Sequence, residues 1–96
     1  MKAVSLYRKK HVAEDGSIIE VRIWKVPVTP DRPEGMKYSL VYVRHGKRLV
    51  GYDNAERQGH HRHLKDTVKP YVFRGIRRLF RDFHRDIVRL QREESR

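Results

Sequence analysis

The chain of 96 residues contains no cysteine. Disulfides, thiolate zinc sites and covalent cysteine catalysis are therefore excluded. No apolar run approaches the roughly 20 residues that cross a bilayer, and the basic N-terminus lacks the apolar stretch of a signal peptide. A glycine-rich phosphate loop, a serine nucleophile elbow and a His-Glu-x-x-His motif are also missing, which argues against nucleotide hydrolases and the corresponding proteases. We expect a soluble, cytoplasmic protein without membrane contact.

Positive charge is abundant instead. Lys and Arg number 23 against 12 Asp and Glu, which leaves a formal net charge of +11. Such self-repulsion destabilises a lone compact chain unless an acidic partner offsets it, and nucleic acid is the commonest partner of this kind. A membrane surface or an acidic protein would also fit the charge, because net charge says nothing about the geometry of a partner. Because a domain of this size has a thin core, a homodimer is a further alternative.

The first half of the sequence predicts strands. Residues 3–12, 18–26, 38–44 and 49–53 alternate and are rich in β-branched and aromatic side chains. Turn residues separate the first pair at Glu14-Asp15-Gly16 and the second at His45-Gly46-Lys47, whereas a proline-rich loop spans residues 28–35. We therefore predict a four-stranded antiparallel β-meander over residues 3–53.

The C-terminal part has a helical period. Apolar residues between 74 and 92 fall within a stripe about 100° wide, which we expect to pack on the sheet. The predicted fold class is α+β, with residues 1–96 as one domain and a His-rich loop at 54–73 joining the sheet to a helix at 74–92. Arginines form a ridge opposite the apolar stripe, with Asp82 and Asp86 on its flank. The predicted nucleic-acid-binding residues are Arg74, Arg78, Arg81, Arg85 and Arg89 on this ridge, with Lys65 in the loop.

The His-rich loop offers acid–base chemistry. If residues 60–63 are extended, His61 and His63 lie on one side and His60 and Arg62 on the other. Cleaving RNA without a metal requires a base for the 2′-hydroxyl, an acid for the leaving 5′-oxygen and cations around the phosphate, all of which imidazoles and arginine supply. The predicted catalytic residues include His61 and His63 as acid and base, Asp53 as their orienter and Arg62 on phosphate. Tyr71 or Lys65 could bind phosphate or assist proton transfer, and His60 completes the predicted catalytic set.

Two other interpretations of this loop remain open. His61, His63 and Asp53 could hold a divalent metal, although His-x-His is a weak signal and no spacing argues for a fourth ligand. The histidines could also pair with Asp53 or Asp66 in a purely structural polar turn. We expect no metal and no cofactor.

The residues that carry the chemistry also carry a resemblance. The segments Gly51-Tyr52-Asp53-Asn54, Gly59-His60-His61-Arg62-His63, Pro70-Tyr71-Val72-Phe73 and Leu79-Phe80-Arg81-Asp82-Phe83 resemble the TumE-type toxins of prokaryotic toxin–antitoxin pairs. The resemblance implies a toxin encoded beside a helix-turn-helix antitoxin, arresting growth through an attack on RNA or translation. Its matching positions are Tyr52, Asp53, Asn54, His60, His61, Arg62, His63 and Tyr71.

Our first hypothesis is thus the toxin of a type II toxin–antitoxin system that acts on RNA as a metal-independent endoribonuclease. The alternative is a non-catalytic nucleic-acid-binding or translation-blocking module. A third is a protein-interaction domain whose basic helix meets an acidic antitoxin segment. The first hypothesis expects the loop imidazoles and the helix arginines to face the same phosphate chain.

Overall fold

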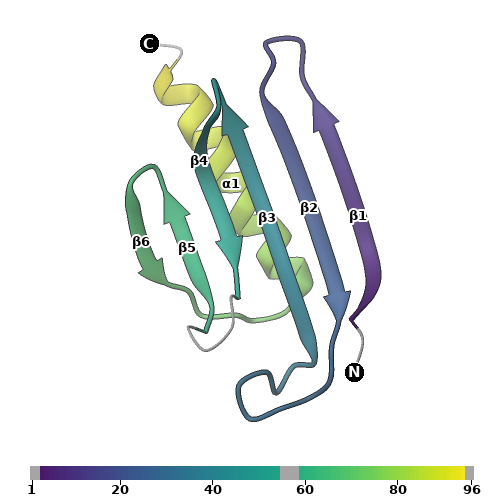
Figure 1. Cartoon of the computed structure of the whole chain (residues 1–96). Coiled ribbons are helices and arrows are strands. Elements are labelled where there is room, and N and C mark those ends of the chain that lie inside the picture. Colours follow the sequence, from purple (N-terminus) through teal and green to yellow (C-terminus); the bar gives the residue numbers. More distant parts are fainter. Residues whose placement is uncertain (1–2, 55–58, 95–96) are drawn as a thin grey trace.

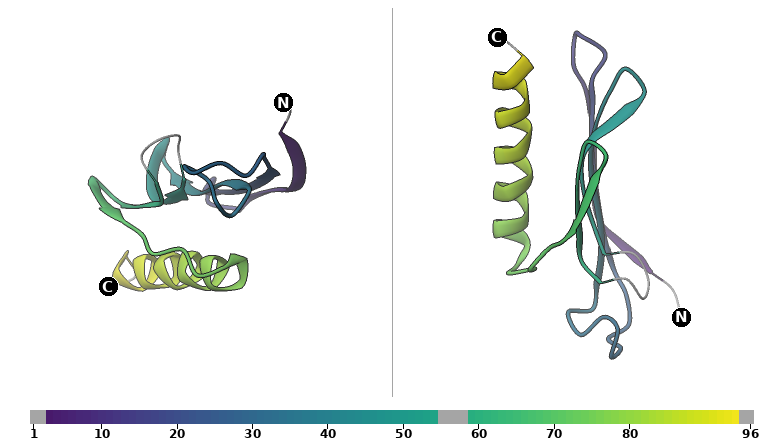
Figure 2. Two further views of the ribbon diagram at one scale, coloured as in Figure 1. Left: turned by 90° about the horizontal axis from the view of Figure 1, so that it is seen from below. Right: turned by 90° about the vertical axis from the view of Figure 1, so that its left-hand side faces the viewer.

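The computed structural model describes residues 3–54 and 59–94. They form one antiparallel sheet of six strands, ordered along the sheet as along the chain, with a single helix across one face (Figure 1). The helix lies on one side only, so the sheet has a helix-covered face and a helix-free face (Figure 2). The elements are β1 (Val4–Val12), β2 (Ile18–Lys25), β3 (Met36–Arg44), β4 (Lys47–Asp53), β5 (His61–Leu64), β6 (Thr67–Pro70) and α1 (Ile76–Glu94).

Short turns set the register of the β1–β2 pair and of the β3–β4 pair. The β3–β4 turn has His45 and Gly46 at φ values of 52° and 73°, the positive pair that a two-residue hairpin turn requires because it matches the strand twist. The β1–β2 turn has Gly16 at φ 84°. Both predicted turns are confirmed.

The core lies between α1 and the helix-covered face. On α1, the buried apolar residues recur at helical spacing, and on β2, β3 and β4 they recur at every second position. Together these two stripes form one cluster of Val21, Ile23, Tyr38, Leu40, Tyr42, Val50, Tyr52, Leu79, Phe83, Ile87 and Leu90.

The helix does not cover the whole sheet. All nine residues of β1 are exposed, although the ring of Tyr7 lies 6.1 Å from that of Phe80 on α1. On the helix-free face Trp24 is partly buried, and the Lys37 ammonium lies 5.5 Å from its ring centroid. Trp24 therefore has the ordinary packing role that its place in a strand suggests.

The α+β class and the C-terminal helix on an antiparallel sheet are confirmed, but the prediction of four strands is wrong. The segment 54–73, predicted to be a loop, contains β5 and β6; its residues 55–58 lie outside the described part of the chain. The helix begins at Ile76, so Arg74 precedes it. Within the described residues, no helix is long and apolar enough to cross a membrane.

Candidate functional site

Strand β5 divides the predicted site between two faces of the sheet. His61 pairs with Asp53 across the β4–β5 ladder, and Arg62 pairs with Tyr52, whose ring meets Phe83 of α1. Because side chains alternate along a strand, Arg62 points toward α1 while His61 and His63 point to the helix-free face. The expectation that the imidazoles and the helix arginines share one surface is therefore wrong.

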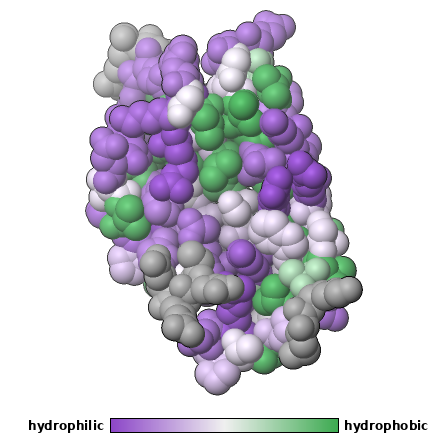
Figure 3. Space-filling model, in the orientation of Figure 1, coloured by the Kyte–Doolittle hydropathy of each residue, from purple (hydrophilic) through white to green (hydrophobic). Residues whose placement is uncertain are grey.

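On the helix-free face four side chains form a group that we call the imidazole site: Arg48, Asp53, His61 and His63. The His61 and His63 rings have centroids 6.4 Å apart. His63 Nε2 lies 3.0 Å from Asp53 Oδ2, and Arg48 Nη2 lies 2.9 Å from His63 Nδ1. This face carries mixed hydrophilic and apolar side chains with no helix above them (Figure 3).

These contacts favour one tautomer of His63. A guanidinium only donates, so Nδ1 of His63 is the acceptor from Arg48. The ring proton then lies on Nε2, which donates to Asp53. Asp53 thus holds the ring in the tautomer whose Nδ1 has a free lone pair and can act as a base. In this structure that lone pair accepts the hydrogen bond from Arg48.

His61 differs from His63 in its contacts. Its Nδ1 is buried and has no hydrogen-bond partner among the described residues. Most buried polar atoms are paired, and one that is not calls for a specific explanation, such as a functional role. His61 Nδ1 therefore has no partner within the described residues, whereas both ring nitrogens of His63 have one.

Gly51 makes the position of Arg48 possible. A Cβ added to Gly51 would lie 3.0 Å from Arg48 Cδ and 3.5 Å from His63 Cβ. The guanidinium reaches His63 across a strand position that has no side chain, so any larger residue there would push Arg48 outward.

Replacing Gly51 with Ala is therefore expected to separate Arg48 from His63, so that Nδ1 of His63 loses its hydrogen bond from the guanidinium. The Arg48→Gln variant should weaken the same bond. The nitrogen chemical shift of His63 Nδ1, measured by NMR at one fixed pH, reports both changes. Equal Nδ1 shifts in the parent and both variants would contradict the contact.

His60 has a different environment. Its Nδ1 lies 2.7 Å from the Tyr38 hydroxyl, and its ring stacks on Phe73 at 4.9 Å with an interplanar angle of 5°. Nε2 is 3.4 Å from Glu34. These contacts tie the start of β5 to the segment before α1, which indicates a structural role for His60.

Asn54 also has internal contacts. Its side-chain oxygen accepts from the Tyr38 backbone N–H at 2.9 Å, and its Nδ2 donates to the Met36 carbonyl at 2.8 Å. It secures the end of β4 against β3.

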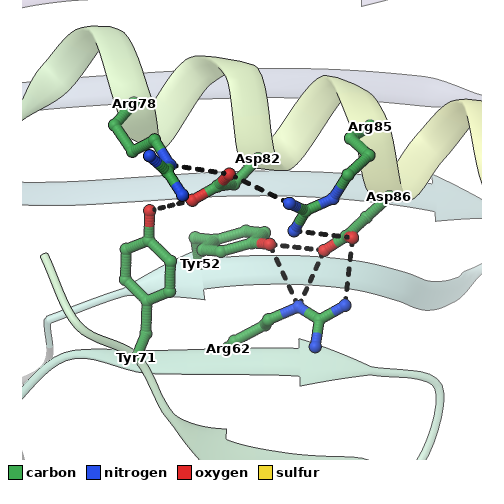
Figure 4. A network of polar contacts seen from close by, with 7 residues as sticks. All are labelled: Tyr52, Arg62, Tyr71, Arg78, Asp82, Arg85 and Asp86. Atoms are coloured by element: carbon green, nitrogen blue, oxygen red, sulfur yellow. Dashed lines mark hydrogen bonds and ion pairs between the residues drawn. The ribbon is translucent and has the colours of Figure 1, made fainter. Parts of the chain in front are cut away.

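Arg62 and Tyr71, the other predicted catalytic residues, belong to a second group that we call the helix-side network (Figure 4). Arg62 donates two hydrogen bonds to Asp86, at 2.8 Å and 3.0 Å, and Tyr52 donates a third. Asp86 is almost completely buried, with its side chain 1% exposed. The residues of the network are Tyr52, Arg62, Tyr71, Arg78, Asp82, Arg85 and Asp86.

Asp82 organises the other half of this network. Its Oδ2 accepts from the Tyr71 hydroxyl at 2.6 Å. Its Oδ1 lies 3.4 Å from Arg78 Nε and 3.2 Å from Arg85 Nη1. The expectation that Asp82 and Asp86 flank the helix surface is wrong, since both are buried against the sheet and hold arginines around them.

The network shifts several pKa values. Burial alone would raise the pKa of Asp86, but hydrogen bonds from Arg62 and Tyr52 and the charges of Arg62 and Arg85 outweigh it, so the pKa lies below its usual value. Burial and a hydrogen bond to a carboxylate raise the pKa values of Tyr52 and Tyr71. Both tyrosines therefore stay protonated donors, and both aspartates act as their acceptors.

The remaining predicted nucleic-acid contacts lie along α1 and its edge. Lys65 and Arg89 line a hollow between α1 and the β5–β6 hairpin, where the Lys65 ammonium lies 3.9 Å from Glu93. Arg74 lines a second hollow with Arg78 and Arg85. Arg81 is exposed and makes no hydrogen bond or ion pair in the part of the chain that the structure describes. Most of the predicted ridge therefore faces the hairpin.

No three His, Cys, Asp or Glu residues in 3–54 and 59–94 come together in a way that could hold a metal ion. The imidazole site has three side chains of these types, His61, His63 and Asp53. Nδ1 of His63 accepts a hydrogen bond from Arg48, so this nitrogen is not directed at a metal position.

Sequence reasoning missed Arg48, Asp82 and Asp86. Arg48 is far from His61 and His63 in the sequence, and only the pairing of β4 with β5 brings it near His63. Two acidic residues four positions apart beside an apolar helical stripe were the available signal for Asp82 and Asp86, because such carboxylates can be buried when arginines and tyrosines satisfy them.

A family model described as Toxin TumE matches residues 3–91, and the chain belongs to this family. The comparisons with curated proteins and with solved structures found no match to this chain. The family assignment agrees with the resemblance in the sequence.

Proposed function

We propose that this chain is the toxin of a type II toxin–antitoxin pair and cleaves RNA without a metal, at the imidazole site. The observation that carries the proposal is the pair of rings whose centroids lie 6.4 Å apart on the helix-free face. At that spacing one phosphodiester can lie within about 2.6–3.2 Å of a nitrogen on each ring, the reach of a general acid or base.

The contacts support a distinct role for each imidazole. Arg48 leaves His63 when its guanidinium pairs with the incoming phosphate, for which it has a strong bidentate preference. The freed Nδ1 of His63 takes the proton of the ribose 2′-hydroxyl, whose oxygen attacks phosphorus. The bond to the 5′-oxygen breaks, and that oxygen takes a proton from the His61 imidazolium. The products are a 2′,3′-cyclic phosphate and a 5′-hydroxyl end.

Asp53 and Arg48 support this sequence of steps. The Asp53 carboxylate, 3.0 Å from Nε2, stabilises the imidazolium that forms on His63. Arg48 offsets the charge that develops on the phosphate oxygens. Arg62 and Tyr71, on the opposite face, have no contact with this phosphate.

A cleavage assay with a metal chelator tests the proposal. We expect the purified protein to cut single-stranded RNA in excess EDTA and to leave 2′,3′-cyclic phosphate ends, identified by mass spectrometry. A matched substrate with one 2′-deoxynucleotide at the cut site should resist cleavage there, because the attacking oxygen is gone. Cleavage of that deoxy position, or a strict requirement for a divalent ion, would contradict the mechanism.

A second candidate function has its own support. The arginines of α1 line hollows beside the β5–β6 hairpin, which favours a nucleic-acid-binding or translation-blocking module without catalysis. Such a module binds RNA with a steep salt dependence and leaves its strands intact. The same cleavage assay separates the two functions.

Membership of a toxin family implies an antitoxin partner. We propose that this partner carries a helix-turn-helix and that both proteins act in the cytoplasm. A homodimer is compatible with the exposed edge strand β1, whose unpaired backbone groups are open to another strand.

A further inference from the structure

A hollow of about 360 Å³ lies between α1 and the segment that leaves β6. This volume is within the range of small-molecule sites. It is on the opposite side of the sheet from the imidazole site, and the proposed cleavage of RNA at His61 and His63 does not involve it. Its lining residues are Arg62, Pro70, Tyr71, Val72, Arg74, Arg78, Asp82 and Arg85.

We propose that this hollow is a nucleotide-binding site that takes a 5′-phosphate on its arginines. Four guanidiniums and one carboxylate line it, which leaves a net charge of +3. Guanidiniums form paired hydrogen bonds with phosphate oxygens, so an excess of them in a concave site favours a phosphate over a neutral ligand.

The arginines are held in place before any ligand binds. Asp82 holds Arg78 and Arg85 at 3.4 Å and 3.2 Å, and Asp86 holds Arg62 through two hydrogen bonds. Each carboxylate uses only part of the guanidinium it contacts, because an arginine has five N–H donors. The remaining donors are available to a phosphate at little cost in side-chain entropy.

Arg74 differs from the other arginines of the hollow. It is exposed, precedes α1 and makes no hydrogen bond or ion pair within the described residues. Its charge is therefore not offset locally, and its flexible side chain can close over a phosphate.

The rest of the lining suits a base or ribose. Pro70, Tyr71 and Val72 form one wall, and the Tyr71 ring is fixed edge-on against Tyr52, with centroids 4.9 Å apart. A nucleobase can pack on such an apolar and aromatic wall without sequence preference. A free nucleotide and a nucleotide within an RNA strand share this chemistry.

The inference deepens the proposed function, on which it rests for the choice of RNA, but it depends on different residues. Titration with adenosine 5′-monophosphate, followed by NMR or calorimetry at low salt, tests it. The parent protein should bind this nucleotide at least about tenfold more tightly than adenosine, because each charge-assisted phosphate contact is worth about a factor of ten.

Matched variants locate the site. Arg74→Glu and Arg78→Gln should each weaken nucleotide binding about tenfold, whereas Arg77→Glu, on the same turn but outside the hollow, should change it less than twofold. Arg74→Glu breaks no internal contact, so its melting temperature should equal that of the parent. Equal losses in Arg74→Glu and Arg77→Glu would overturn the proposal.

Two further ligands identify the occupant. A hexaadenylate RNA should bind at least as tightly as the mononucleotide and lose affinity in Arg74→Glu. Tighter binding of a hexaglutamate peptide than of hexaadenylate would overturn the nucleotide assignment in favour of an acidic protein segment. Because the mononucleotide cannot be cleaved, binding without ribonuclease activity would contradict only the proposed function, and cleavage without nucleotide binding only this inference.

Discussion

Replacing both His61 and His63 with Ala is expected to lower the rate of RNA cleavage at least about 10³-fold, because it removes the acid and the base together. The two losses should not multiply, since groups that act in one step are not additive. Each single variant should therefore be nearly as slow as the double variant. Initial rates on a labelled RNA in EDTA measure the effect, and growth after induced expression gives a second readout.

Two exposed histidines provide the matched control. His11 on β1 and His84 on α1 lie outside both polar groups, so the His11→Ala/His84→Ala variant loses the same number of imidazoles from other surfaces. It should cleave RNA at the parental rate. Parental cleavage by the His61→Ala/His63→Ala variant would show that the imidazole site is not catalytic.

The fold was predictable from sequence where patterns are local. Alternation over β1 to β4 and the helical stripe of α1 each involve many residues, so the period is unmistakable. Strands β5 and β6 have four residues each, and few of these residues are apolar. Their turn uses Lys65 at φ 54° rather than a glycine or asparagine, so it lacked the usual signature.

The site was predictable only in part. The alternation of side chains along an extended strand placed His61 and His63 on one side and Arg62 on the other, as the structure has them. Which side of β5 would face the helix depends on its pairing with β4, and no local pattern encodes that pairing. Arg62 and Asp86 are 24 positions apart, and their contact exists only after the hairpin folds back beside α1.

The helix-side network should be essential for stability, and Asp86→Asn tests it most directly. The substitution keeps the shape but leaves the Arg62 guanidinium without its counter-charge next to the core. Breaking one partner of a buried pair costs about 3–5 kcal/mol, and the partial exposure of Arg62, 24% of its side chain, favours the lower end. Small domains have only about 5–15 kcal/mol in total. We therefore expect a fall of about 3 kcal/mol in the free energy of unfolding, measured by urea denaturation.

The pH dependence of this loss separates charge from packing. The pKa of Asp86 is lowered in the folded state, so its stabilising effect is present above the ordinary Asp pKa of about 4 and disappears as the pH falls through the lower, folded value. The parent should thus lose stability below about pH 4 more steeply than Asp86→Asn does. Asp66→Asn is the control, because its side chain is 87% exposed beside Lys47 and an exposed ion pair contributes at most about 1 kcal/mol. Similar losses in Asp66→Asn and Asp86→Asn, or parallel pH profiles of the parent and Asp86→Asn, would mean that α1 is held by its apolar stripe and not by this buried pair.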